Sequence, residues 1–113
     1  MPPSVSVTIV TFNSRRYIGR CLEAALAQDY PRLEIIVVDN ASQDGTRDIL
    51  QEYAGRVRVI PNDRNTGFAA AQNQAIAAST GQWVLTLNPD VLLQPGFLSN
   101  LVAAGESDAR TGT

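Results

Sequence analysis

The side chains available for chemistry in this sequence are carboxylates, amides and hydroxyls, because histidine and lysine are absent and all nine basic residues are arginine. Without histidine there is no Ser-His-Asp triad and no histidine-ligated zinc. Without lysine there is no P-loop lysine and no Schiff base. The single cysteine, Cys21, excludes an internal disulfide and a Cys-x-x-Cys site. What remains is chemistry from oxygen ligands, arginine and a bound metal.

Four short polar segments carry most of these oxygen ligands, at residues 11–14, 39–42, 62–67 and 88–90. Two carboxylates in these segments, Asp39 and Asp90, come directly after an apolar run or within three residues of one. Mg²⁺ or Mn²⁺ typically takes one or two protein carboxylates and completes its shell with water or phosphate oxygens. Asp90 is therefore the candidate metal ligand, and Asp39 could accept hydrogen bonds from a base or a ribose.

The apolar pattern between these segments alternates between strand and helix. Short, mostly apolar runs predict four strands, at residues 5–12, 33–38, 56–60 and 83–87. Apolar residues at helical spacing predict four helices, at residues 15–28, 46–53, 68–79 and 97–104. This order is typical of an α/β fold: a Rossmann-like three-layer αβα arrangement with a mostly parallel sheet. We expect one domain over residues 1–104 and a frayed tail over residues 105–113.

This topology places the four polar segments at one edge of the sheet, because each follows a predicted strand. Ligands of open parallel sheets bind outside the carboxyl ends of the strands. Residues 11–14 contain no glycine, which argues against a dinucleotide-binding Gly-x-Gly-x-x-Gly loop. A bound diphosphate would then need a divalent cation to neutralise it. A phospho-receiver domain is rejected, since it requires an acidic pair after the first strand and a lysine.

The sequence resembles the N-terminal half of family 2 glycosyltransferases of the GT-A fold, in particular their rhamnosyltransferase-like branch. Four segments carry the resemblance in the family's order and spacing: VTIVTFN (7–13), LEIIVVDNASQDGT (33–46), NTGFAAAQN (65–73) and LNPDV (87–91). It implies that residues 1–104 are the nucleotide-sugar-binding half of an inverting glycosyltransferase. The donor would be a UDP- or dTDP-linked sugar, and the cofactor Mg²⁺ or Mn²⁺.

The resemblance also implies roles for individual residues. Phe12 stacks beside the base, Asp39 hydrogen-bonds the pyrimidine, and Asp90 binds the metal at the position of the family's Asp-x-Asp motif. The segment from Asn65 to Asn73 closes over the nucleotide. The complete set of nucleotide-sugar-binding candidates is Thr11, Phe12, Asn13, Asp39, Asp44, Asn65, Gly67, Gln72, Asn73, Asn88 and Asp90.

The sequence departs from the family pattern at three points. Asn88 replaces the first acidic residue of the Asp-x-Asp motif, which removes a charge but keeps an oxygen. Gln72 stands where many relatives carry arginine, which shifts more of the charge balance onto the metal. No residue matches the Asp or Glu that deprotonates the acceptor hydroxyl. We therefore assign no catalytic residue, and expect the chain to bind a donor weakly without turnover.

Each polar segment also has a structural interpretation. Asp39 could cap the turn before the second predicted helix, and Asp44 could form that helix's N-terminus. Residues 65–67 could be a plain loop, and residues 88–90 a β-turn. For the whole chain, the alternative to a glycosyltransferase domain is a non-catalytic module that self-associates or pairs with another subunit.

Composition sets the remaining expectations. A net charge of −2 argues against a general nucleic-acid binder. No apolar run reaches the roughly 18 residues of a membrane span, and no signal-peptide pattern is present. We expect a cytoplasmic protein, at the inner membrane face if it follows relatives that build cell-wall or capsule polysaccharide. An unpaired sheet edge would favour a homo-oligomer.

Overall fold

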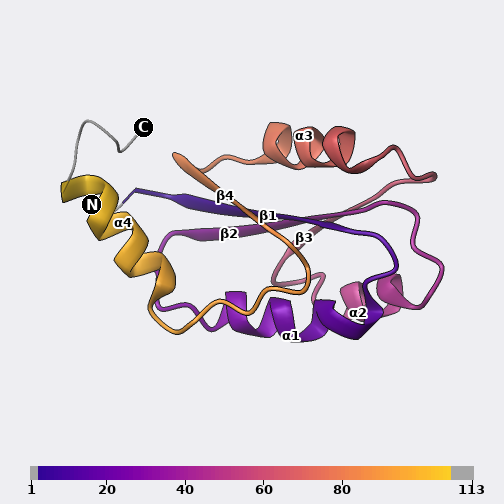
Figure 1. The fold of residues 1–113 in the computed structure, drawn as a ribbon, viewed down its shortest axis with the longest axis horizontal. Helices are drawn as coiled ribbons and strands as arrows, with labels where there is room; N and C mark the ends of the chain where they lie inside the picture. The colour runs from indigo at the N-terminus through magenta and orange to yellow at the C-terminus, as the bar shows by residue number, and fades with distance from the viewer. Residues whose placement is uncertain (1–2, 108–113) are drawn as a thin grey trace.

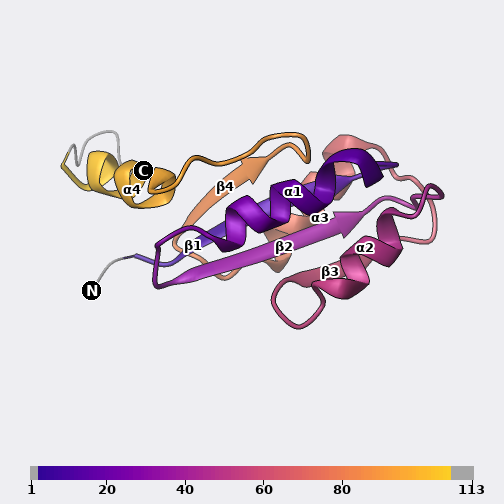
Figure 2. The ribbon, with the colours of Figure 1, turned by 90° about the horizontal axis from the view of Figure 1, so that it is seen from below.

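The computed structural model describes residues 3–107 and confirms the α/β architecture. Four parallel strands form one sheet in the order β3-β2-β1-β4. Helix α3 covers one face, and α1 and α2 lie on the other (Figure 1; Figure 2). The elements are β1 (Val5–Thr11), α1 (Arg15–Leu26), β2 (Leu33–Asp39), α2 (Thr46–Glu52), β3 (Arg58–Pro61), α3 (Phe68–Ala78), β4 (Trp83–Leu87) and α4 (Phe97–Ser107).

All predicted strands and helices are present, with small shifts at their ends. The last helix continues to Ser107, past its predicted end at Ala104, so the first part of the predicted tail is helical. The rest of that tail, residues 108–113, lies outside the described residues. None of the helices within residues 3–107 combines the length and the apolar character needed to cross a bilayer.

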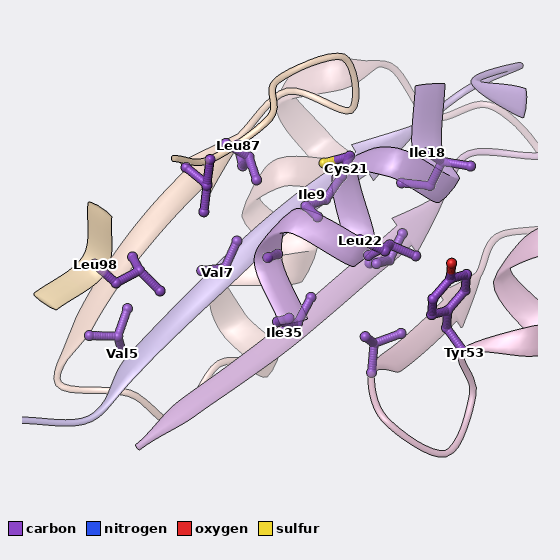
Figure 3. Packing of buried hydrophobic residues seen from close by; sticks show 14 of the residues in the cluster. Val5, Val7, Ile9, Ile18, Cys21, Leu22, Ile35, Tyr53, Leu87 and Leu98 are labelled. Carbon is purple, nitrogen blue, oxygen red and sulfur yellow. The ribbon is translucent and has the colours of Figure 1, made fainter. Parts of the chain in front are cut away.

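Two hydrophobic clusters hold the layers together, one on each face of the sheet. Successive strand residues point to opposite faces, so Val7 and Ile9 of β1 pack on the α1 side, whereas Val10 packs on the α3 side. The larger cluster includes Leu22 of α1 (Figure 3). On the other face, the small side chain of Ala71 on α3 lets the helix lie close to β1 and β2. This explains the alanine-rich composition of α3.

The strand register brings the carboxyl ends of the strands to one edge. Thr11 of β1 lies beside Asp39 of β2, and Ile9 of β1 lies beside Leu87 of β4. Asp39 in turn lies beside Pro61 of β3. The polar segments that follow the strands therefore start from the same edge, as predicted.

Candidate functional site

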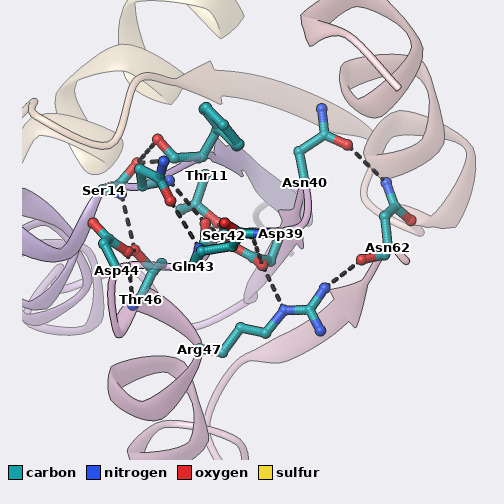
Figure 4. Close-up of polar contacts among 12 residues, drawn as sticks. Thr11, Ser14, Asp39, Asn40, Ser42, Gln43, Asp44, Thr46, Arg47 and Asn62 are labelled. Atoms are coloured by element: carbon teal, nitrogen blue, oxygen red, sulfur yellow. Dashed lines mark hydrogen bonds and ion pairs between the residues drawn. The ribbon is translucent and has the colours of Figure 1, made fainter. Parts of the chain in front are cut away.

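The loops after β1 and β2 are joined by several hydrogen bonds (Figure 4). The backbone N–H of Asn13 donates to Ser42 Oγ at 2.8 Å, and Asn13 Oδ1 accepts from the Gln43 N–H at 2.8 Å. The next residue, Ser14, donates its N–H to Thr46 Oγ1 at 2.9 Å. Asn13 has a φ of 49°, which asparagine tolerates better than most residues. The hydrogen bonds of Asn13 thus connect the loop after β1 to the loop after β2.

Asp44 lies at the N-termini of two helices. Its Oδ2 accepts the N–H of Arg15 in α1 at 3.1 Å, and its Oδ1 accepts the N–H of Thr46 in α2 at 3.0 Å. A carboxylate is stabilising at a helix N-terminus. Burial raises the pKa of Asp44, but the hydrogen bonds from Thr46 and Arg15 together outweigh it and hold the pKa below its ordinary value. Asp44 therefore links the loop after β2 to the first residues of α1 and α2.

Asp39 is fully buried, and both of its oxygens are engaged. Oδ1 accepts from Thr11 Oγ1 at 2.7 Å and Ser42 Oγ at 2.6 Å. Oδ2 accepts from the Ser42 N–H at 3.1 Å and Arg47 Nε at 2.8 Å, which also forms an ion pair. Burial raises the pKa of Asp39, but the hydrogen bonds from Arg47, Ser42 and Thr11 outweigh it and lower the pKa below its ordinary value. The carboxylate is therefore charged at neutral pH.

Asn40 holds the loop between β3 and α3. It is 2% exposed, and its Nδ2 donates to Asn65 Oδ1 at 3.0 Å and to the Gly67 carbonyl at 3.1 Å. Its Oδ1 accepts from the Thr66 N–H at 3.0 Å and from Asn62 Nδ2 at 3.2 Å. One buried amide thus fixes both ends of the loop that carries Asn65.

Replacing Asn40 with alanine should loosen this loop and lower the free energy of unfolding by about 2 kcal/mol, because buried hydrogen-bonding groups would lose their partners. Hydrogen exchange should become faster at the backbone amides of Thr66 and Gly67. The exposed Asn73, replaced in the same way, is the control. Unchanged exchange at residues 62–67 in the Asn40→Ala variant would contradict this role.

An open pocket of about 410 Å³ lies where these loops meet the segment after β4. Two exposed aromatic rings line it: Phe12 after β1 is 49% exposed and Phe68 at the start of α3 is 61% exposed. Among residues 3–107, Asp90 is the only charged residue that lines it, and no arginine does. The lining residues are Val10, Phe12, Ser14, Asn40, Asn65, Phe68, Asn88, Pro89 and Asp90. Among the predicted candidates, the pocket brings together Phe12, Asn65, Asn88 and Asp90.

Other predicted candidates lie outside this pocket. Asp39 and Arg47 line a separate cavity of about 180 Å³ beside α2. Gln72 is directed at the sheet, where its Nε2 donates to Thr8 Oγ1 of β1 at 2.9 Å. Asn73 is exposed on α3. A second open pocket of about 610 Å³ at the same edge is lined by two further candidates, Asn13 and Asp44, together with Arg15, Arg16 and Tyr17.

The segment after β4 carries two side chains with oxygen atoms that could act as ligands for a cation. Asn88 and Asp90 are exposed, and no group of three or more carboxylate or cysteine side chains that could hold a metal occurs within residues 3–107. Cys21 Sγ lies 3.8 Å from the Asn88 carbonyl oxygen, but burial and then the Asp90 carboxylate raise the pKa of the thiol to about 11. The thiol is therefore protonated at neutral pH, and Mg²⁺ prefers oxygen ligands to sulfur. The oxygens of Asn88 and Asp90 fit Mg²⁺ or Mn²⁺ if other oxygens complete the shell.

Sequence reasoning missed three residues that shape this edge: Asn40, Arg47 and Phe68. Asn40 directly follows Asp39, so strand alternation alone predicts that the two side chains point to opposite faces. The sequence gives only a weak indication of a site residue at Phe68, which is an aromatic residue at the boundary between a polar loop and a helix. The ion pair between Arg47 and Asp39 has no sequence signal, because it depends on how the intervening loop folds.

Comparisons with known proteins show the family and the fold of the chain. Residues 6–112 match the family model "Glycosyl transferase family 2". The chain is 34% identical over 106 residues to the succinoglycan biosynthesis protein ExoO of Rhizobium meliloti, covering 93% of this chain and 30% of ExoO. The chain spans about a third of the length of the first curated relatives that it matches.

Two solved structures show the same fold. The complex of S. aureus TarS 1–349 with UDP-GlcNAc superposes with a TM-score of 0.86 at 28% identity, covering 94% of this chain and 32% of that chain. The mannosyltransferase PcManGT of Pyrobaculum calidifontis, solved with GDP-Man and Mn²⁺, has a TM-score of 0.84 at 32% identity, covering 90% of this chain and 32% of that chain.

Proposed function

The chain belongs to glycosyl transferase family 2, and we therefore propose that it binds a nucleoside-diphosphate sugar, together with a divalent cation, at the pocket on the carboxyl edge of the sheet. One observation carries the proposal: Phe12, Asn65, Asn88 and Asp90 come from three loops to line the same pocket. Exposed aromatic rings suit a planar base, and a single carboxylate suits a cation that a diphosphate helps to hold. The complexes of TarS with UDP-GlcNAc and of PcManGT with GDP-Man and Mn²⁺ support this assignment.

In this proposal, each lining residue contacts a different part of the bound donor. Phe12 stacks on the base, and Asn65 offers an amide to the ribose or the phosphates. Asp90 and Asn88 hold Mg²⁺ or Mn²⁺, which when bound neutralises charge on the diphosphate. Phe68, the second exposed ring, packs on the apolar face of the donor. Since none of the arginines in the described part of the chain lines the pocket, we propose that the diphosphate depends on the cation for its neutralisation.

The other predicted candidates support the pocket or extend it. Asn13 and Asp44 position the loop that carries Phe12, and Gln72 fixes α3 on the sheet. A pyrimidine N–H that bonded to Asp39 would have to replace one of the bonds from Ser42, Thr11 or Arg47. The remaining members of the proposed nucleotide-sugar set are Thr11, Gly67 and Asn73.

For the activity, we propose that this chain is the donor-binding part of an inverting glycosyltransferase and does not turn over alone. The expected acceptor-activating carboxylate has no counterpart in the sequence. We further propose a UDP- or dTDP-linked donor and a role in polysaccharide biosynthesis. The place of action would be the cytoplasm, at the inner membrane face. Measurable glycosyl transfer by the purified chain would contradict the proposed inactivity.

Titration calorimetry with UDP and dTDP, with and without Mn²⁺, tests the binding proposal. Binding should require Mn²⁺ and should weaken roughly 10-fold in Phe12→Ala, since stacking of a base on an aromatic ring contributes about 1–3 kcal/mol. Phe97→Ala, which removes another exposed ring outside the pocket, is the matched control. The proposal would be wrong if neither nucleotide bound in Mn²⁺, or if the two variants lost affinity equally.

A further inference from the structure

The segment between β4 and α4, residues 88–97, has little core packing of its own. Leu93 is the only buried residue of these ten, and its neighbours Val91 and Leu92 are 38% and 51% exposed. Asp90, the proposed cation ligand, lies in this exposed stretch. Figure 1 shows the segment running from β4 past α1 to α4. Its conformation must therefore depend largely on hydrogen bonds.

Two turns give the segment its shape. In the first turn, the Asn88 carbonyl accepts the Val91 N–H at 3.1 Å, which places Asp90 at the third position of the turn. In the second turn, the Gln94 carbonyl accepts the Phe97 N–H at 3.0 Å. Each turn is closed by one backbone hydrogen bond, so contacts from outside the segment decide how firmly it is held.

Gln28, which follows α1, makes such a contact at the second turn. It is 8% exposed, and its Nε2 donates to the Gln94 carbonyl at 2.9 Å. Its Oε1 accepts the N–H of Leu98 at 3.0 Å. Leu98 lies in the first turn of α4, where N–H groups have no acceptor within the helix. Gln28 therefore joins the second turn and the start of α4 to the end of α1.

Cys21 of α1 lies at the first turn. Its buried Sγ is 3.8 Å from the Asn88 carbonyl oxygen, a distance at which the thiol can donate a weak hydrogen bond. In the core it belongs to the same cluster as Leu87 at the end of β4 (Figure 3). Residues of α1 and the residues directly after it thus contact both turns of the segment.

We propose that Gln28 is a positioning residue for the cation site, because it fixes the segment that carries Asp90. This rests on the proposed function, in which Asp90 is the ligand of Mg²⁺ or Mn²⁺. Without the Gln28 amide, the Gln94 carbonyl and the Leu98 N–H lose their bonds, and the segment gains conformations in which Asp90 is displaced. Cation binding must then order the segment, which lowers the affinity.

Titration with UDP at a series of Mn²⁺ concentrations tests this role on the full chain. The Mn²⁺ concentration for half-maximal UDP binding should rise roughly 10-fold in Gln28→Ala and in Gln28→Met, which keeps the length of the side chain. This is the lower end of the effect that residues supporting a metal ligand commonly have. A smaller folded fraction alone would reduce the amount of UDP bound without moving this concentration.

Ser99→Ala is the matched control. Ser99 Oγ of α4 donates to the Asp29 carbonyl at 2.8 Å, so this variant also loses a hydrogen bond between α4 and the residues after α1. Ser99 lies outside the segment, and the variant should therefore keep the wild-type dependence on Mn²⁺.

Labelling of Cys21 with N-ethylmaleimide supplies a readout that needs neither nucleotide nor metal. The thiol is buried against the first turn, so a loosened segment should expose it. Labelling should be several times faster in both Gln28 variants than in the wild type. Val57→Ala, a change at a buried residue beside β3 on the opposite edge of the sheet, shows how far lost stability alone accelerates labelling.

The outcomes separate this role from the proposed function. Gln28 variants with the wild-type dependence on Mn²⁺ would overturn the role of Gln28 and leave the cation site in place. Labelling that is no faster than in Val57→Ala at equal stability would overturn it as well. A wild type whose UDP binding does not respond to Mn²⁺ would overturn the proposed cation site and the role of Gln28 together.

Discussion

Replacing Asp90 with alanine is expected to remove the effect of Mn²⁺ on nucleoside-diphosphate binding and to weaken binding in Mn²⁺ roughly 100-fold. Of the residues that the structure describes, Asp90 is the only carboxylate in the pocket, and no arginine there could neutralise the diphosphate in place of the cation. Substitution of a residue that hydrogen-bonds to a metal ligand commonly lowers metal affinity by about 10- to 100-fold. Loss of the ligand itself should lower it by at least about 100-fold. Titration of UDP with and without Mn²⁺ measures the effect.

Two variants sharpen this prediction. Asp63→Ala removes another exposed carboxylate outside the pocket and should leave the Mn²⁺ dependence unchanged. Asn88→Asp adds a negative charge beside Asp90 and should raise the affinity for Mn²⁺. An Asp90→Ala variant whose affinity responds to Mn²⁺ as the wild type does would show that the cation binds elsewhere.

Replacing Asp39 with alanine should lower the free energy of unfolding by about 3 kcal/mol. The carboxylate is completely buried and accepts bonds from Thr11, Ser42 and Arg47. Each buried donor left without a partner costs about 1–3 kcal/mol, and the partly exposed Arg47 adds little because water can reach it. Urea unfolding measures the loss, with the exposed Asp29→Ala as the control.

The same carboxylate should give the fold a pH dependence. Because the pKa of Asp39 is lower in the folded chain than its ordinary value of 3.8, its contribution to stability is present at pH values above 3.8. The contribution is lost as the pH falls through the folded pKa. Wild-type stability should therefore drop more steeply below about pH 4 than that of Asp39→Ala. Parallel curves would contradict a stabilising role of the ionised carboxylate.

The fold was predictable because local patterns and topology agree. The continuous apolar strands predict burial on both faces, and the helical spacing of Ile18 and Leu22 predicts which side of α1 is buried. The alternation of strands and helices then restricts the topology to a parallel sheet. Element ends were less predictable: α1 ends at Leu26, before its predicted end at Gln28.

The candidate site was predictable as an edge, but not in its internal contacts. The position after each strand is enough to bring Phe12, Asn65 and Asp90 together, since parallel strands share a carboxyl edge. Which polar side chains remain available to a ligand depends on hydrogen bonds between residues that are distant in the sequence. Gln72 is bonded to Thr8, far away in the sequence, and neither residue alone indicates this bond.

The most direct test of the pocket is a map of backbone amide NMR shifts on titration with UDP and Mg²⁺. We predict that the largest changes occur at residues 11–13, 65–68 and 88–90, with little change at Glu34 and Thr80 on the amino edge of the sheet. The changes should disappear when EDTA removes the cation. Shifts centred on the amino edge or on the outer face of α1, or shifts that EDTA does not alter, would contradict a cation-dependent nucleotide pocket at the carboxyl edge.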